Sequence, residues 1–434
     1  MLFLLLISCT TESNNTTWHK DIRPIAEQNC VSCHSEGSIG PFDLRTMETW
    51  TALGDVILTT ITEKRMPPWG AEKGHQEYRY DISLSENQIK SILQWYESNT
   101  PEGNEEDHAS LPTVDQGGME HIDIELSMPA SYTPITGETD DYRCFPIEWD
   151  RDTYITGFNA IPGNIQSVHH LVAYWIPPRQ TELVRGFDEQ DEKAGYPCYG
   201  GPAMTGWEPD SIVDSIVPSF LGQWAPGMLG TTLPEGIGLK VEQGGTIVLQ
   251  MHYFTALAED PTDLSKFQFA VSDEVDKEAY YVPWMNTMWY YAPESMLIPA
   301  NEEEVTHNFT STFEENGTLS LIFGTDFNED LQLHSIFPHM HQLGKSIMLT
   351  LGEGDTQQTL IEVPNYDFNW QREYHLTQPI DFSAQESIDI TCTWDNTIEY
   401  RSERGVDPIE PIDVGWGENT QDEMCIAMLL ITKK

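Results

Sequence analysis

Residues 246–253 of this chain read TIVLQMHY. The odd-numbered positions are apolar and the even-numbered positions are mostly polar, which is the two-residue period of a β-strand. His252 therefore points away from the more apolar face, towards a site or solvent. Short alternating runs of this kind, separated by Gly, Pro, Asn and Asp, recur from about residue 119 to the C-terminus without a long helical period. This pattern predicts all-β sandwich domains of a jelly-roll-like kind.

Further soft metal ligands lie on both sides of this stretch, as His169-His170, His339-Met340-His341 and Met424. The first and third residues of the HMH run would share one face of a strand, where they can bind one metal. The adjacent pair His169-His170 can converge on one metal only at a strand end or a bulge. Imidazole binds zinc, copper, iron and nickel alike, whereas a thioether favours Cu(I). Spacing alone does not group these residues into sites, and a single histidine usually has a structural role.

Residues 30–34 read CVSCH, a haem-attachment motif in which Cys30 and Cys33 bind the porphyrin and His34 is an axial ligand of the iron. A zinc or redox CxxC is the alternative. The flanks favour haem, because residues 21–25 (DIRPI) are typical of the first helix of a small cytochrome c. A capping box at residues 85–88 begins an apolar helical period that predicts a closing helix. We expect a small all-α cytochrome c-like domain at residues 18–100.

Met66, followed by Pro67-Pro68-Trp69, lies where such domains place the distal methionine. Ligation by Met and His raises the haem potential. Met66 could instead be a buried core residue, and Met47 or His75 could compete for the sixth position.

The chain of 434 residues is long enough for two to four domains. Its formal net charge of -48 repels nucleic acid, so no nucleic-acid partner is expected. Residues 101–118 have the composition of a linker between the haem domain and the β domains.

Residues 1–9 read MLFLLLISC, and their end resembles a bacterial lipobox with Cys9 as the acylated residue. The apolar run is too short to span a bilayer. Residues 10–17 would be a polar tether, and the lipid would anchor the protein to a membrane of the bacterial cell envelope, on the periplasmic or outer-surface side. A slightly apolar, frayed N-terminus is the alternative.

The chain has seven cysteines. One would carry lipid and two would carry haem, which leaves an even number. In an oxidising compartment these four are expected to pair, and their order in the chain favours Cys144–Cys198 and Cys392–Cys425. The second bridge would stabilise the fold by roughly 3–4 kcal/mol on the chain-entropy model.

Several motifs in residues 119–434 together resemble the copper type II, ascorbate-dependent monooxygenases, the family of peptidylglycine α-hydroxylating monooxygenase and dopamine β-monooxygenase. They occur in the family's order and include the lesser match WAPG at 224–227. The main motifs are His169-His170, LQMHY at 249–253, HMHQLGK at 339–345, DFNWQ at 367–371 ahead of Tyr374, and DEMC at 422–425.

The resemblance implies two copper ions in two jelly-roll-like domains, at residues 119–284 and 285–434, that face each other across a solvent-filled cleft. His169, His170 and His252 correspond to the electron-transfer copper. His339, His341 and Met424 correspond to the oxygen-binding copper, which makes Met340 a spacer. Cys392 and Cys425 match a family bridge that holds Met424 in place.

The implied activity is hydroxylation of a C–H bond of a small molecule with O2 and two electrons. The electrons would come from ascorbate or from a cytochrome-type donor, which the fused haem would replace or relay. Where peptide-amidating members have an Arg, this chain has Phe337, and Ile426 and Met428 follow Cys425, so the substrate pocket is expected to be rather apolar. A copper and haem electron-transfer protein, or a copper-binding surface lipoprotein, is the alternative.

Overall fold

The structure is a computed structural model that describes residues 16–36, 38, 40–112, 117–135, 140–206, 218–225, 228–255, 260–316, 327–406 and 408–434. Cys9 and most of the predicted tether lie outside these residues. The chain forms two compact units, one of residues 1–69 with 80–116 and one of residues 70–79 with 117–434. Among the described helices, none has both the length and the apolar character needed to cross a membrane.

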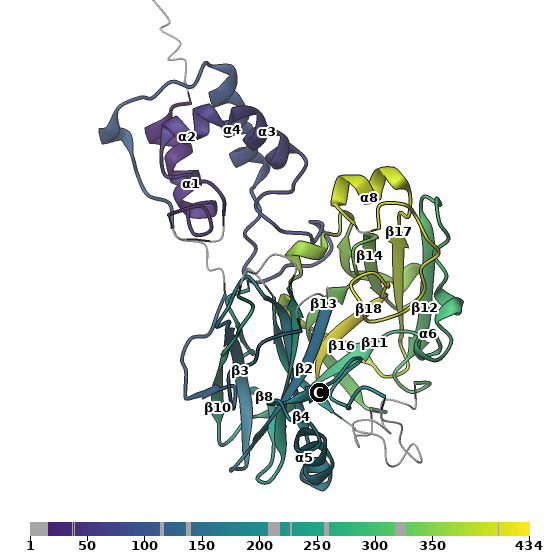
Figure 1. The fold of residues 1–434 in the computed structure, drawn as a ribbon. Helices are drawn as coiled ribbons and strands as arrows, with labels where there is room; N and C mark the ends of the chain where they lie inside the picture. Colours follow the sequence, from purple (N-terminus) through teal and green to yellow (C-terminus); the bar gives the residue numbers. More distant parts are fainter. Residues whose placement is uncertain are drawn as a thin grey trace, which may run out of the picture. The chain divides into compact units, whose positions relative to one another are not determined.

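The first unit is helical (Figure 1). Its core contains the rings of Trp18, Trp50 and Trp95, whose centroids lie 5.8–6.5 Å apart. The predicted capping box is present, since Ser85 and Gln88 exchange side-chain and backbone hydrogen bonds at the start of the closing helix. A small helical domain at the N-terminus is thus confirmed. Its elements are η1 (Trp18–Ile22), α1 (Arg23–Asn29), α2 (Met47–Ala52), α3 (Gly54–Thr62), α4 (Glu86–Glu97) and η2 (Glu105–Asp107).

The second unit consists mainly of β-sheets, as the alternating pattern predicted. A five-stranded sheet has the order β5-β2-β9-β4-β6. It contains β5 (Tyr196–Pro197), β2 (Asp140–Glu148), β9 (Thr246–Phe254), β4 (Val168–Ile176) and β6 (Ser219–Trp224). β9 contains the stretch at 246–253 and is buried at every position except Phe254, so both of its faces are covered.

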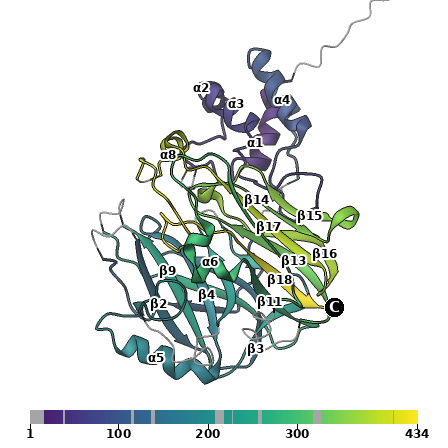
Figure 2. The same ribbon diagram turned by 90° about the vertical axis from the view of Figure 1, so that its right-hand side faces the viewer.

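A nine-stranded sheet continues through both halves of this unit, in the order β1-β10-β3-β8-β11-β18-β13-β16, with β7 paired to β3. The halves join where β11 pairs in parallel with β8 on one side and antiparallel with β18 on the other. Figure 2 shows β11, β18, β13 and β16 side by side. The strands are β1 (Ile124–Ser127), β10 (Lys266–Ser272), β3 (Thr153–Ile161), β8 (Ile237–Val241), β11 (Lys277–Trp284), β18 (Ile426–Lys433), β13 (Asp330–His339), β16 (Tyr374–Ser383) and β7 (Thr231–Thr232).

A four-stranded sheet of order β12-β17-β14-β15 completes the second unit. Its strands are β12 (Val305–Thr312), β17 (Ser387–Trp394), β14 (Gly344–Leu351) and β15 (Gln358–Val363). The helices of this unit are short: η3 (Pro178–Gln180), α5 (Thr181–Glu189), α6 (Thr287–Tyr291), η4 (Pro293–Met296), η5 (Gly354–Thr356), η6 (Phe368–Trp370) and α8 (Ile398–Arg404).

Both predicted disulfides are present. Cys144 on β2 is bonded to Cys198, and Cys392 on β17 is bonded to Cys425 directly before β18. The second bridge therefore joins the four-stranded sheet to the nine-stranded sheet. It does so at the residue that follows Met424.

Candidate metal centres

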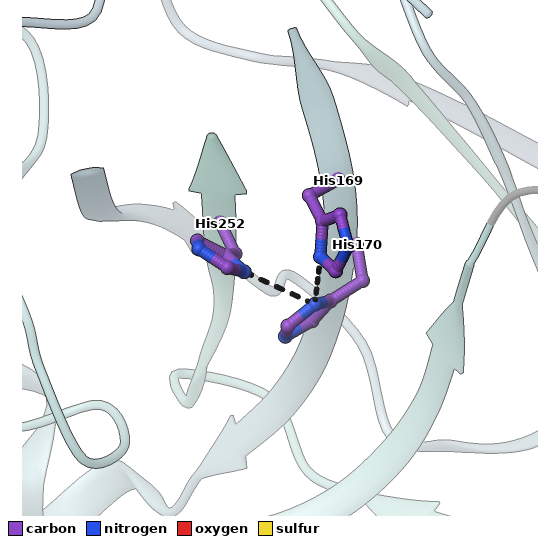
Figure 3. Close-up of side chains that lie close together, drawn as sticks. All are labelled: His169, His170 and His252. Carbon is purple, nitrogen blue, oxygen red and sulfur yellow. Dashed lines mark hydrogen bonds between the residues drawn. The ribbon is translucent and has the colours of Figure 1, made fainter. Parts of the chain in front are cut away.

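Three histidines from neighbouring strands converge at one end of the five-stranded sheet (Figure 3). Nδ1 of His170 lies 3.1 Å from Nδ1 of His169 and 3.2 Å from Nδ1 of His252. The pairing of β4 with β9 shifts register between Val168 and His170, so a β-bulge turns two adjacent side chains towards one point. Of the two possibilities that the sequence left open, a strand end or a bulge, the structure has the bulge. The sequence alone could not have said which nitrogens meet.

The His252 ring is fixed by a hydrogen bond at Nε2 and by an aromatic neighbour. Its Nε2 donates to Oδ1 of Asp140 over 2.7 Å, and Thr420 Oγ1 donates to the same carboxylate oxygen over 2.8 Å. The ring of Tyr142 stacks on the imidazole at a centroid distance of 4.2 Å. A carboxylate on the far nitrogen fixes the tautomer of a metal-binding histidine. Nδ1 of His252 is thus left as the ligand atom.

Burial keeps His169 and His170 neutral. It lowers the pKa of His169 to about 4, with a further contribution from the neighbouring His252. Burial also lowers the pKa of His170 well below its ordinary value, with added effects from His252 and His169 and from the more distant His339 and His341. Neutral imidazoles have free lone pairs, so three nitrogen donors without a carboxylate in the set fit a copper ion.

His339 and His341 form the second set, but not for the reason expected from their spacing. β13 ends at His339, so His341 lies beyond the strand and alternation does not place it. Their ring centroids are nevertheless 5.1 Å apart. Nδ1 of His339 donates to Oε1 of Gln371 over 2.6 Å, and Nδ1 of His341 donates to the carbonyl oxygen of Asp422 over 2.9 Å. Both rings therefore leave Nε2 available as the ligand atom.

Glu423 is a functional residue that the sequence reasoning missed. Its carboxylate is fully buried and accepts hydrogen bonds from the backbone N–H of His341 over 3.0 Å and of Leu343 over 2.6 Å. It also accepts a 2.7 Å hydrogen bond from Nε1 of Trp394. Burial raises the pKa of Glu423 to about 7. The sequence signal was an acidic residue directly before the proposed ligand Met424. A carboxylate that is buried at such a place needs several hydrogen-bond donors, and these would come from the surroundings of the site.

Met424 follows Glu423 and precedes the disulfide at Cys425. Ile426, at the start of β18, is the partner of His339 in the pairing of β13 with β18. Strand register, a disulfide and a buried carboxylate therefore hold Met424 alongside the turn that contains His339 and His341. Two imidazoles and a thioether are a donor set that suits Cu(I).

One aromatic ring contacts both histidine sets. Phe368, in the short helix η6, is stacked on His169 with centroids 5.5 Å apart. It also lies edge-on to His341 at 5.8 Å. The ring comes from the segment that also supplies Gln371, so a single turn of chain contacts His169 of the first set and orients His339 of the second.

The CxxCH segment of the helical unit is compatible with a covalently bound haem. Cys30 and Cys33 are both free thiols. Nδ1 of His34 is buried without a hydrogen-bond partner, and a Cβ on Gly40 would come within 2.5 Å of it, so only glycine leaves room beside this ring. The two free thiols and the histidine that follows them are the groups that haem attachment would use.

The candidates for the sixth haem ligand differ in their surroundings. Met66 is partly buried at the loop that follows α3, and Met47 packs against the helical core. Nε2 of His75 pairs with Oε2 of Glu362 on β15 over 2.8 Å, and both belong to the second unit. His75 therefore already has a partner in the second unit.

The fold and its sites define a class of protein, a copper- and haem-containing oxidoreductase. Residues 283–431 match the family described as copper type II ascorbate-dependent monooxygenase, C-terminal domain, and residues 19–83 match cytochrome C oxidase, cbb3-type, subunit III. The two matches, a cytochrome c domain first and a copper type II monooxygenase C-terminal domain second, agree with the fusion that the resemblance predicted.

Comparison with curated proteins finds no match. Among solved structures, the infectious bursal disease virus VP2 subviral particle is similar with 10% identity over 73% of this chain and 75% of that chain, at a TM-score of 0.18. The Gx strain of that virus gives 10% identity over 75% of each chain, at 0.17. Similarity this low carries no argument about fold or function.

Proposed function

We propose that this protein is a copper-dependent monooxygenase that hydroxylates a C–H bond of a small, rather apolar molecule. The reaction would consume the substrate, O2, two electrons and two protons and give an alcohol and water. Copper bound at both histidine sets would supply one-electron redox chemistry and the reduction of dioxygen. The observation that carries the proposal is that one set brings three Nδ1 atoms together, while the other leaves two Nε2 atoms available on a turn that is held by Glu423, the residue before Met424.

The chain's own residues supply positioning rather than acid or base catalysis. Asp140, Gln371 and the carbonyl of Asp422 each accept the ring N–H of one histidine and so fix which nitrogen faces the metal. Phe368 covers one ring from each set with an apolar face, which limits water between them. Water exclusion of this kind protects reactive oxygen chemistry from side reactions.

The surroundings of His339 favour an apolar substrate. Phe337 is 6% exposed, and its ring is stacked beside that of His339 at 6.1 Å. An arginine at this place would bind a carboxylate, whereas phenylalanine offers only van der Waals contact. We therefore infer a substrate that is recognised by shape and apolar surface.

The remaining elements of the proposal concern electrons and location. The covalently attached haem, with His34 and Met66 as axial ligands, would deliver electrons to the copper sites in place of ascorbate or as a relay. A lipid on Cys9 would anchor the protein to the cell envelope.

The test is metal analysis combined with product analysis under labelled dioxygen. We expect two coppers and one haem per chain, and one labelled oxygen atom in an alcohol product when apolar substrates are supplied with ascorbate. A single copper, zinc in place of copper, or reduction of O2 without any labelled product would contradict the proposal. The last result would favour an electron-transfer protein instead.

A further inference from the structure

Residues 70–79 form a segment that we call the strap. In sequence it lies inside the cytochrome c match at residues 19–83, but in the structure it belongs to the compact unit that contains the copper domains. The chain leaves the helical unit at Trp69 and re-enters it at Tyr80. The strap is therefore joined to the haem domain by a peptide bond at each end.

Backbone hydrogen bonds attach the strap to two strands of the second unit. The N–H of Glu72 donates to the carbonyl of Glu362 on β15 over 2.7 Å. Further along, the N–H of Arg79 donates to the carbonyl of His375 on β16 over 2.7 Å, and Tyr78 forms an antiparallel bridge with Leu376. The strap thus adds backbone pairing to β16 in the way that an edge strand does.

Side chains reinforce this attachment. The hydroxyl of Tyr78 donates to the carbonyl of Leu360 over 2.6 Å, and its ring lies edge-on to that of Tyr374 at 5.6 Å. The Gln76 amide donates to the carbonyl of Thr359 over 2.8 Å. Contacts with β15 and β16 therefore involve most of the ten residues of the strap.

The first residue of the strap makes a close contact. The N–H of Gly70 donates to Oη of Tyr374 over 3.2 Å. A Cβ at this position would come within 2.9 Å of the same oxygen and within 2.9 Å of Val363 Cγ1. A side chain at this position would therefore displace the Tyr374 hydroxyl, the Val363 side chain or the strap itself.

The strap contacts the first residue of β16, which lies close in the chain to Gln371, the hydrogen-bond partner of His339. Tyr374 opens β16 three residues after Gln371, whose Oε1 accepts the Nδ1 proton of His339 over 2.6 Å. On the other side, Gly70 follows Met66 by four residues in the chain. A continuous series of covalent bonds and two hydrogen bonds therefore leads from the proposed haem ligand to the proposed ligand of the oxygen-side copper.

We propose that the strap is the electron-entry element of this protein, and that the haem delivers electrons first to the His339/His341/Met424 site. In this step a ferrous haem is oxidised to the ferric state and one Cu(II) is reduced to Cu(I), with transfer of one electron and no proton. The inference rests on the proposed function, which supplies the haem and the copper ions. It goes beyond that function by naming the copper site that receives the electron and the residues through which the electron passes.

The test uses the full chain with haem attached and both coppers oxidised, under anaerobic conditions and without substrate. One electron per chain is delivered to the haem by pulse radiolysis, and the reoxidation of the haem is followed by its absorbance. Freeze-quenched samples report by EPR which Cu(II) signal disappears. We expect a concentration-independent phase in which the signal of the His339/His341/Met424 site is lost first.

Two variants probe the strap and one is a matched control. Gly70→Ala and Tyr374→Phe should slow this concentration-independent phase, because the first crowds the Tyr374 hydroxyl and the second removes the oxygen that accepts from the N–H of Gly70. Gly186→Ala is the control, because a Cβ added there on α5 meets nothing within 4 Å. Unchanged rates in both strap variants, at normal copper content, would overturn the proposal.

Two further variants identify the site of entry. The concentration-independent phase should persist in His252→Ala and disappear in His339→Ala, with copper analysis showing that each variant retains its other site. The reverse pattern would overturn the proposal. Product formation with ascorbate and labelled dioxygen is measured separately. If the electron reaches the copper and no labelled product forms, the proposed function fails. If product forms but the strap variants transfer electrons normally, the route fails.

Discussion

Replacement of Glu423 gives the sharpest test of how the second histidine set is held. In Glu423→Leu a side chain of similar volume removes the acceptor of three donors, the N–H groups of His341 and Leu343 and the indole of Trp394. A hydrogen bond to a charged group contributes roughly 1.5–3 kcal/mol. In Glu423→Leu the three buried N–H donors lose their acceptor, at about 1–3 kcal/mol each. This outweighs the gain from no longer burying a carboxylate, so we expect a loss of about 3–5 kcal/mol in total.

Glu423→Gln is the matched variant. Its carbonyl oxygen can still accept from two donors, but its NH2 group faces the third, so we expect a loss of only about 1–2 kcal/mol. The free energy of unfolding should therefore rank wild type above Gln above Leu. Copper should be lost from the His339/His341/Met424 site alone, because the other set receives no contact from Glu423 in the described structure.

The assay is urea denaturation followed by tryptophan fluorescence, together with copper content and the EPR spectrum of each site. Glu399→Gln, an exposed carboxylate on α8, controls for the loss of a negative charge. The reasoning is refuted if Glu423→Leu unfolds within 1 kcal/mol of wild type, a difference below what even one lost buried hydrogen bond gives. Equal loss of copper from both sites would also refute it.

Three further predictions concern other parts of the second unit. Asp140→Asn should weaken copper binding at the His252 site by about 10- to 100-fold, measured by competition with a chelator, and leave the second site unchanged. Replacing both Cys392 and Cys425 by Ser should lower the free energy of unfolding by about 3–4 kcal/mol, because the bridge closes a loop of 33 residues. Burial lowers the pKa of His334 to about 4, so the unfolded chain binds a proton more readily, and stability should fall as the pH drops from about 6.5 to 4. The pH dependence of unfolding should be flatter in His334→Gln, and an identical slope in the variant would contradict this account.

The sequence was most informative where one local rule fixes the outcome. The capping box at Ser85 predicts the closing helix because its two hydrogen bonds lie within four residues. For His169 and His170 the local rule went only part of the way, since it required a strand end or a bulge and the structure has a bulge. The two disulfides are those that the order of the four remaining cysteines favoured.

The sequence was least informative where a residue is held by a distant partner. The spacing of His339 and His341 was attributed to a strand, but the strand ends at His339 and the turn is held by Glu423, about eighty positions later. The strap was assigned to the haem domain by its position in the chain, whereas its partners on β15 and β16 lie some 280–300 residues further on. The periodic pattern of apolar residues within a short stretch of sequence carries no information about contacts between residues so far apart in the chain.

The choice of ring nitrogen agrees with the different tasks that we propose for the two copper sites. Nδ1 is closer to the backbone than Nε2, so three Nδ1 ligands on paired strands hold a metal close to the rigid sheet. A fixed environment suits an ion that only gains and loses electrons, because little has to reorganise. Two Nε2 ligands and a flexible thioether place a metal further from the backbone, beside Phe337 and Phe368. The second arrangement leaves space on the metal for reactants, and for this reason we assign the oxygen chemistry to the site that contains Met424.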